Sequence, residues 1–199
     1  MSDLGNLSYF LGLDFKDTNE GVFLHQTKYA QDILKRFKMR NCNVVVTPLE
    51  IGAKLRKEIN DDFLSATLYK QIIGSLRYLC NTKPYICQNV ILLSIFMEKP
   101  QECHLTIIKR VLRYMKGMLD HGVLMPRNKK IDTNARIYGY TDSYLSGNQD
   151  ENKSVAGYIF MIGGAPISWS SRKKNIVALS YCEAEYVDAS HATCQTAWI

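Results

Sequence analysis

The sequence predicts an α+β fold in which a β-hairpin and several helices come first and a strand-rich segment with a final helix follows. Residues 7–24 are rich in aromatic and branched side chains on both sides of a turn-forming segment. Apolar residues at spacings of three and four recur through residues 68–118, and three strand-like segments follow between residues 136 and 171. The chain has 199 residues, of which 46% are hydrophobic and 22% charged, so a disordered or collagen-like chain is excluded.

Residues 7–24 are predicted to form the β-hairpin, with its turn at residues 17–21. Thr27 can cap the helix that follows. The apolar face of this helix is expected to consist of Tyr29, Ile33, Leu34 and Phe37. Residues 41–49 then break the regular structure, and Pro48 fixes its own φ angle there.

Three further helices are predicted in the middle of the chain. A polar connector at residues 54–62 precedes the first of them. The apolar face of this helix is expected to consist of Leu68, Ile72, Leu76 and Leu79. The next helix covers residues 84 to about 97, with Pro100 beyond its end, and the last covers about 103–118.

The final third of the chain predicts strands and one helix. The strands are expected at residues 123–125, 136–141, 155–162 and 167–171. Residues 163–166, Gly-Gly-Ala-Pro, form a tight link between the last two strands, and the pattern becomes helical from Val177 to the end. A domain boundary is expected between about Met125 and Asn134, which divides the chain into residues 1–125 and 135–199.

Positive charge is concentrated before this boundary. Residues 101–130 carry a net charge of +5, whereas residues 131–199 carry −2. Lys109, Arg113 and Lys116 share one face of the helix at residues 103–118, and Arg110 lies beside them. Cations at one-turn intervals suit successive phosphates of a nucleic acid, although an ordinary solvated helix face explains the same spacing.

Carboxylates suited to metal binding occur in two places. Asp142 is expected at the end of the strand at 136–141, where a rigid backbone precedes an open loop, although a lone Asp there is often a turn or cap residue. On the final helix Glu183 and Glu185 point about 200° apart, so one of them can face the sheet. Glu185 shares its side with small residues and has Asp188 as its neighbour. The alternative to metal binding is that these acidic residues stabilise the start of the helix by interacting with its dipole.

The remaining polar residues predict little chemistry. The six cysteines form no C-x-x-C pair and are expected to be free thiols, and the histidines have no ligand spacing. Lys173 and Lys174 beside Arg172 are expected to form a short surface patch. The longest apolar run, Val90–Met97, is too short to span a bilayer and no secretory signal is recognised, so an intracellular protein of the cytoplasm or nucleus, without membrane contact, is expected.

Six segments of the sequence match a known family in the order in which they occur. They are LGNLSYFLGLDF, QTKYAQDILKRFKM, VTPLE, YKQIIGSLRYLCNTKPYI, FMEKPQECHLTIIKRVLRYMKG and YTDSYLSGNQDENKSVAGYIFMIGGAPISWSSRKKNIVALSYCEAEYVDAS. In this order they resemble the C-terminal part of the Pol polyprotein of copia-type LTR retrotransposons, over essentially residues 1–199.

The resemblance implies that residues 1–125 correspond to a reverse transcriptase after its catalytic aspartates: late palm, then thumb and connection helices, without the Tyr-x-Asp-Asp motif. Residues 135–199 resemble the first part of an RNase H-like β-β-β-α module. Asp142 matches the catalytic Asp of that family and Glu185 the helix Glu, with Glu183 as the fallback. These residues would hold two Mg²⁺ roughly 3.5–4 Å apart for attack on an RNA phosphodiester.

The resemblance also sets the expected partners and activity. An RNA–DNA hybrid and the rest of the Pol polyprotein are the expected partners, and Lys109, Arg110, Arg113 and Lys116 become expected nucleic-acid contacts. The family's later carboxylates do not occur in the sequence, so the isolated chain is expected to be an inactive fragment. The alternatives are a nucleic-acid-binding remnant without catalysis and a host-adopted or effector-like interaction protein.

Overall fold

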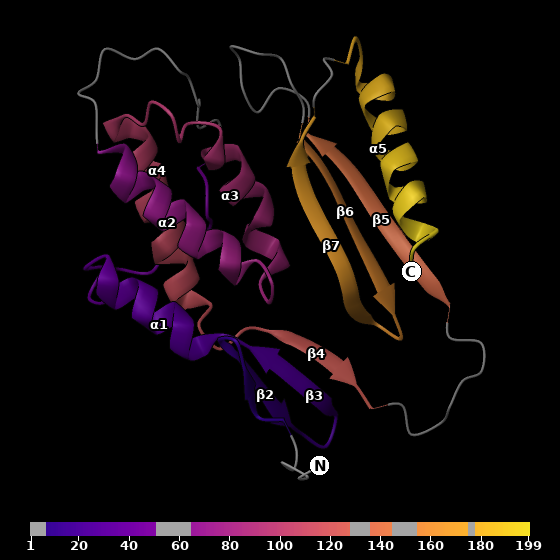
Figure 1. The fold of residues 1–199 in the computed structure, drawn as a ribbon, viewed down its shortest axis with the longest axis horizontal. Helices are drawn as coiled ribbons and strands as arrows, with labels where there is room; N and C mark the ends of the chain where they lie inside the picture. Colours follow the sequence, from indigo (N-terminus) through magenta and orange to yellow (C-terminus); the bar gives the residue numbers. More distant parts are fainter. Residues whose placement is uncertain (1–6, 51–64, 128–135, 145–154, 175–177) are drawn as a thin grey trace.

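The computed structural model describes residues 7–50, 65–127, 136–144, 155–174 and 178–199. The expected connector at residues 54–62 and most of the expected boundary loop lie outside the described residues. Figure 1 shows two antiparallel sheets, a group of helices beside both of them, and a separate last helix. The α+β class is therefore confirmed, while the RNase H-like assignment and the domain limits stay predictions.

The first sheet contains β1 (Tyr9–Phe10), β2 (Leu13–Asp17), β3 (Gly21–His25) and β4 (Val123–Pro126), in that order. The predicted hairpin is the β2–β3 pair, and Thr18 Oγ1 closes its turn by donating to Gly21 O at 2.6 Å. The short strand β1, which the sequence analysis did not separate, folds back at Leu11 and Gly12, whose φ angles are 48° and 81°. Strand β4 pairs with β3 and joins the end of this part to its beginning.

The helical group consists of α1 (Thr27–Arg36), α2 (Ala66–Leu79), the 3₁₀ helix η1 (Pro84–Ile86), α3 (Cys87–Ser94) and α4 (Glu102–Gly117). These helices bury one core. Its fully buried members include Ala30, Ile73, Leu76, Leu79, Leu93, Ile108, Leu112 and Met115. Removing such apolar surface from water contributes about 25 cal/mol per Å², so this core is the main source of stability.

Three local predictions in this group are wrong. Thr27 is the first residue of α1 and not its cap; the cap position is Gln26, and the Thr27 hydroxyl donates to Leu119 O at 3.1 Å instead. Leu68 is 43% exposed, because α2 turns Tyr69 toward the core. The helix expected at residues 84–97 is shorter, since its first turn is the 3₁₀ helix η1 and α3 ends at Ser94.

A buried lysine fastens the end of α4 to the turn after α2. The Lys83 side chain is 0% exposed, and its Nζ donates to Met118 O at 2.6 Å and to His121 O at 2.8 Å. Burial lowers the pKa of Lys83 to about 8, an effect that Asp120 opposes. The helix C-terminus supplies carbonyl groups without helical partners, and a cation satisfies them.

The second sheet contains β5 (Ile137–Tyr144), β6 (Val155–Ile162) and β7 (Ala165–Lys173), in that order, followed by α5 (Tyr181–Thr196). The β6–β7 turn at Gly163 and Gly164 has φ angles of 56° and 84°, as the predicted glycine link requires. In Figure 1, α5 runs along β5 on one side of this sheet, and the helical group lies on its other side.

The two parts of the chain touch through β7. Trp169 Nε1 donates to Cys80 O at 2.8 Å, and Val155 belongs to the core of the helical group. The second sheet is thus anchored on the side opposite α5. None of the helices in the described ranges is long and apolar enough to cross a membrane.

Candidate metal site between β5 and α5

Asp142 lies within β5 and not at the end of a strand. The sequence predicts a strand that stops at Thr141, but β5 continues because Asp142 pairs with Gly157 and Tyr144 pairs with Val155. The start of β6 at Val155 therefore sets the length of β5. This correction places the carboxylate on regular backbone with a fixed register.

Successive side chains of β5 point to opposite faces of the sheet, which determines the face on which Asp142 lies. Gly139 lies opposite Phe160 on the face covered by α5, and a Cβ on Gly139 would come within 2.5 Å of the Phe160 ring. Thr141 shares that face, whereas Asp142 shares the face of Tyr140. Since β5 is an edge strand of the described sheet, Asp142 borders a cavity on each side of it.

The helix α5 gives its two glutamates different environments. Ser180 caps the helix by accepting a hydrogen bond from Glu183 N at 3.1 Å, and the Glu183 carboxylate accepts from Leu179 N at 2.6 Å. These reciprocal bonds resemble a capping box and occupy Glu183 at the helix start. Glu185 lies farther along α5 and borders the cavity toward β5.

This cavity, of about 400 Å³, is lined by acidic residues of both β5 and α5. Asp142 contributes from β5, and Glu185 and Asp188 contribute from α5. Asp142 and Glu185 are exposed, whereas Asp188 is 2% exposed. Of the two glutamates considered from the sequence, it is Glu185 that shares a cavity with Asp142.

Asp188 is paired with a lysine that the sequence analysis assigned to the surface. Lys174 is 4% exposed, and its Nζ lies 2.8 Å from Asp188 Oδ1 and also donates to Ala184 O. The expected surface patch is therefore wrong for Lys174, because this residue follows the end of β7 and is held against α5 by Asp188 and the Ala184 carbonyl. Neither oxygen of Asp188 receives a hydrogen bond of good geometry from the described residues.

Burial is the main influence on the titration of Asp188. It raises the pKa of Asp188, and the charge of Asp142 adds to this effect. Lys174 and His191 oppose it by favouring the carboxylate. Asp142 and Asp188 are thus close enough for their charges to interact, while Lys174 neutralises the inner side of the cavity.

The acidic residues at this cavity carry the type of donor that Mg²⁺ binds. Mg²⁺ prefers oxygen ligands and is commonly held by one or two carboxylates, with waters and substrate phosphates completing its coordination. Asp142 and Glu185 supply two accessible carboxylates of this kind. In the part of the chain that the structure describes, no three His, Cys, Asp or Glu side chains gather as a preformed metal cluster.

The basic side chains of α4 hold a neighbouring segment of the chain. Arg113 Nε donates to Asn43 O at 2.8 Å, and Lys116 Nζ donates to Cys42 O at 2.7 Å. The Arg110 side chain forms an ion pair with Glu50 Oε1 at 2.7 Å, and its Nε donates to Thr47 O. Its charge is therefore already paired within the chain. Lys109 lies 4.0 Å from Glu102 and is half exposed. Their contact with nucleic acid stays a prediction.

Sequence reasoning missed the two buried lysines. Lys83 and Lys174 are surrounded by carbonyl and carboxylate oxygens contributed by segments far from them in sequence or across a turn. Lys174 lies beyond the last residue of β7, so strand alternation gives no signal for its inward position. No local pattern indicates Lys83.

Comparison with known proteins places these observations in context. The chain is 37% identical over 199 residues to the "Retrovirus-related Pol polyprotein from transposon RE1" of Arabidopsis thaliana, but spans 13% of its length. It is 33% identical over its whole length to the "Uncharacterized mitochondrial protein AtMg00810" of the same plant, covering 80% of that protein. Over 132 residues it is 34% identical to the "Secreted RxLR effector protein 161" of Plasmopara viticola, covering 90% of it.

Neither of the other comparisons returned a relative. No protein-family model matches the chain. No solved structure matches it.

Proposed function

The chain belongs to the family of retrovirus-related Pol polyproteins of copia-type transposons, and on this premise we propose that it is the Pol segment that joins the end of the reverse transcriptase to the start of the ribonuclease H. In this proposal residues 1–125 form the late palm, thumb and connection of the polymerase. Residues 135–199 begin the nuclease, whose substrate is an RNA–DNA hybrid. The rest of Pol is its natural partner.

The observation that carries the proposal is the cavity shared by Asp142 and Glu185. The two residues are 43 positions apart in the sequence, yet the β5-β6-β7-α5 topology brings them to one place. Asp142 lies on the edge strand of the described sheet and lines this cavity together with Glu185. A ribonuclease H centre needs carboxylates from a strand and a helix to converge in this way.

The chain's own groups each have a defined task in this proposal. Asp142 and Glu185 hold Mg²⁺, which when bound supplies Lewis-acid polarisation of the scissile phosphate. The Lys174–Asp188 pair keeps α5 at a fixed position on the sheet, so Glu185 approaches the strand from a rigid helix. Glu183 stabilises the start of that helix through its cap.

Charge balance limits what these residues do alone. Two carboxylates supply two negative charges, whereas a pair of Mg²⁺ ions carries four positive charges, and Mg²⁺ gives up its water reluctantly. Lys174 reduces the local negative charge further. We therefore expect the isolated chain to bind one ion weakly and to leave an RNA–DNA hybrid uncleaved.

Nucleic-acid contact in the proposal involves the basic face of α4. Lys109 is half exposed, and its partner Glu102 is at the limit of ion-pair distance. Arg113 uses its Nε–H on Asn43 O, and a guanidinium has several further N–H donors that suit a phosphate. These two side chains can therefore meet a phosphate without releasing the segment at Cys42 and Asn43.

The test is Mg²⁺-dependent binding of a labelled RNA–DNA hybrid, followed by fluorescence anisotropy. We expect Mg²⁺ to strengthen binding by the wild-type chain. Asp142→Asn and Glu185→Gln should each remove this increment, and Glu183→Gln, which keeps a cap acceptor, should retain it.

Two outcomes distinguish the alternatives. An affinity that does not respond to Mg²⁺, but whose salt dependence falls in Lys109→Gln, would favour a nucleic-acid-binding remnant over the nuclease. A folded chain that binds no hybrid at all would contradict the proposal.

A further inference from the structure

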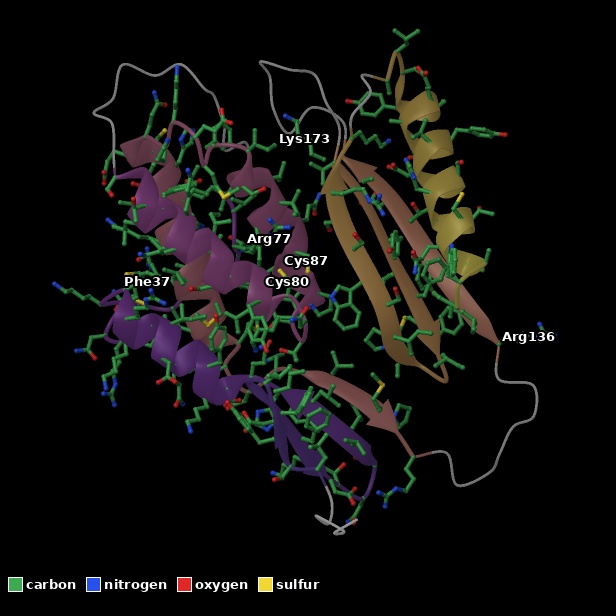
Figure 2. All side chains as sticks on the ribbon, in the orientation of Figure 1. Phe37, Arg77, Cys80, Cys87, Arg136 and Lys173 are labelled. Carbon is green, nitrogen blue, oxygen red and sulfur yellow. The ribbon has the colours of Figure 1, made fainter. Side chains whose placement is uncertain are left out.

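A pair of cysteines lies where α2 ends and α3 begins. Cys80 is the C-terminal cap of α2 and Cys87 is the first residue of α3, with η1 between them. Cys87 Sγ lies 3.8 Å from Cys80 O and 3.8 Å from Lys83 O, so its thiol lies against the backbone of Cys80. Figure 2 shows the labelled Cys80 and Cys87 together on the side of the helices that faces β7.

The pair borders a small cavity at the junction with the second sheet. The cavity has a volume of about 160 Å³ and is also lined by Arg77 and Trp169. Cys80 is partly exposed, whereas Cys87 is 7% exposed. Hydrogen peroxide is small enough to enter a cavity of this volume, and Trp169 is held at its edge by the bond to Cys80 O.

The surroundings give the two sulfur atoms different chemistry. The neighbouring Cys80 side chain lowers the pKa of Cys87, and the backbone and Trp169 add to this effect against the opposing influence of burial. Cys87 and burial together raise the pKa of Cys80. Cys80 Sγ also lies 3.4 Å from Leu76 O, an acceptor for its proton. This asymmetry favours Cys87 as the nucleophile and Cys80 as the resolving thiol.

We propose that Cys80 and Cys87 form a site of reversible oxidation, at which a peroxide converts the two thiols into a disulfide between the end of α2 and the start of α3. The site is separate from the cavity of Asp142 and Glu185 and does not depend on the function proposed for it. It would make the junction between the helical group and the second sheet sensitive to oxidants.

The reaction proceeds in two balanced steps. The Cys87 thiolate attacks one oxygen of hydrogen peroxide, the O–O bond breaks, and hydroxide leaves with the formation of a sulfenic acid. Cys80 sulfur then attacks Cys87 sulfur, the S–S bond forms and the S–O bond breaks, and the leaving hydroxide takes the Cys80 proton as water. Two thiols lose two electrons in total, and one peroxide is reduced to two waters.

The experiment uses the full chain with Cys42, Cys103, Cys182 and Cys194 replaced by Ser. The reduced protein is treated with hydrogen peroxide, unfolded in urea, alkylated and weighed by mass spectrometry. We expect a monomer that has lost two hydrogens and takes up no alkyl group, and full recovery of both thiols with dithiothreitol. Because the native fold holds the sulfur atoms together, the disulfide should form about tenfold faster in the native chain than in urea.

Two controls separate proximity from general reactivity. Cys80→Ser in the same background should stop at a sulfenic acid on Cys87. A matched chain that keeps Cys182 and Cys194, which are exposed on α5, should form no intramolecular disulfide. A native chain in which Cys80 and Cys87 both remain alkylatable, or oxidise no faster than in urea, would overturn the proposal.

Discussion

The buried Lys174–Asp188 pair provides the sharpest test of how the second sheet holds α5. The two side chains are 2% and 1% exposed, and Lys174 Nζ lies 2.8 Å from Asp188 Oδ1. Lys174→Met removes the cation and leaves the Asp188 carboxylate without compensation. Removing one partner of such a buried pair costs about 3–5 kcal/mol, so we expect the free energy of unfolding to fall by this amount at pH 7.

Compensating substitution should restore most of this loss. In Lys174→Met with Asp188→Leu both charges disappear and the volume is largely kept, so we expect a stability within about 1–2 kcal/mol of the wild type. Urea unfolding followed by Trp fluorescence measures the change, because Trp169 belongs to this sheet. The double variant separates the loss of charge compensation from the loss of packing.

An exposed pair serves as the matched control. Lys109 and Glu102 lie 4.0 Å apart and are about half exposed, so Lys109→Met should change the stability by about 0–1 kcal/mol. A Lys174→Met variant that loses no more than this control would refute the assignment of a buried pair. A double variant as unstable as Lys174→Met would also refute it.

Three other changes probe separate parts of the structure. The free energy of unfolding of the wild type should rise between pH 8 and 10.5. In this range the folded Lys83, with its pKa lowered to about 8, has released a proton that the unfolded chain still binds. Urea unfolding measured at several pH values should show this rise for the wild type and not for Lys83→Met. Arg113→Gln removes the bond to Asn43 O and should cost about 1–2 kcal/mol locally, measured as faster hydrogen exchange in residues 42–47; unchanged exchange would contradict the role of α4 in holding this segment. Gly139→Val would place a side chain against the Phe160 ring and should lower the free energy of unfolding by about 1–3 kcal/mol, seen as a lower melting temperature. A melting temperature equal to that of the wild type would contradict this expectation.

Much of the fold could be predicted because local patterns and tertiary packing agree. The β2–β3 hairpin, α4 and β6 follow directly from alternating or helical apolar spacing. The mistakes occur where a tertiary contact outweighs a local preference. Thr27 has the chemistry of a cap, but its hydroxyl is used by Leu119 O from a segment far along the chain.

The candidate site was only partly accessible to sequence reasoning. Helical geometry separated Glu183 from Glu185, and the structure shows the first in the α5 cap and the second beside Asp142 in the cavity. The length of β5 depended on its pairing with β6, which the sequence of β5 alone does not contain. The partner of Asp188 is Lys174, which follows the end of β7, so the burial of Asp188 could not be predicted from the sequence of α5 alone.

The basic face of α4 illustrates a second limit. The spacing of its cations is the same whether they meet phosphates or carbonyls, and the structure supplies carbonyls from residues 42–47. Spacing therefore predicted a basic surface without identifying what it contacts, and its contact with nucleic acid stays a prediction. The strength of nucleic-acid binding is the quantity that separates these uses.

The central claim is that Asp142 and Glu185 hold one divalent cation together, and Mn²⁺ as a paramagnetic probe tests it most directly. NMR signals of residues around the cavity should broaden first as Mn²⁺ is added to the wild-type chain, and Mg²⁺ should reverse the effect. Glu183→Gln should keep this response, whereas Asp142→Asn and Glu185→Gln should each lose it. Broadening that survives in the double variant Asp142→Asn with Glu185→Gln, or that begins elsewhere on the chain, would contradict the account.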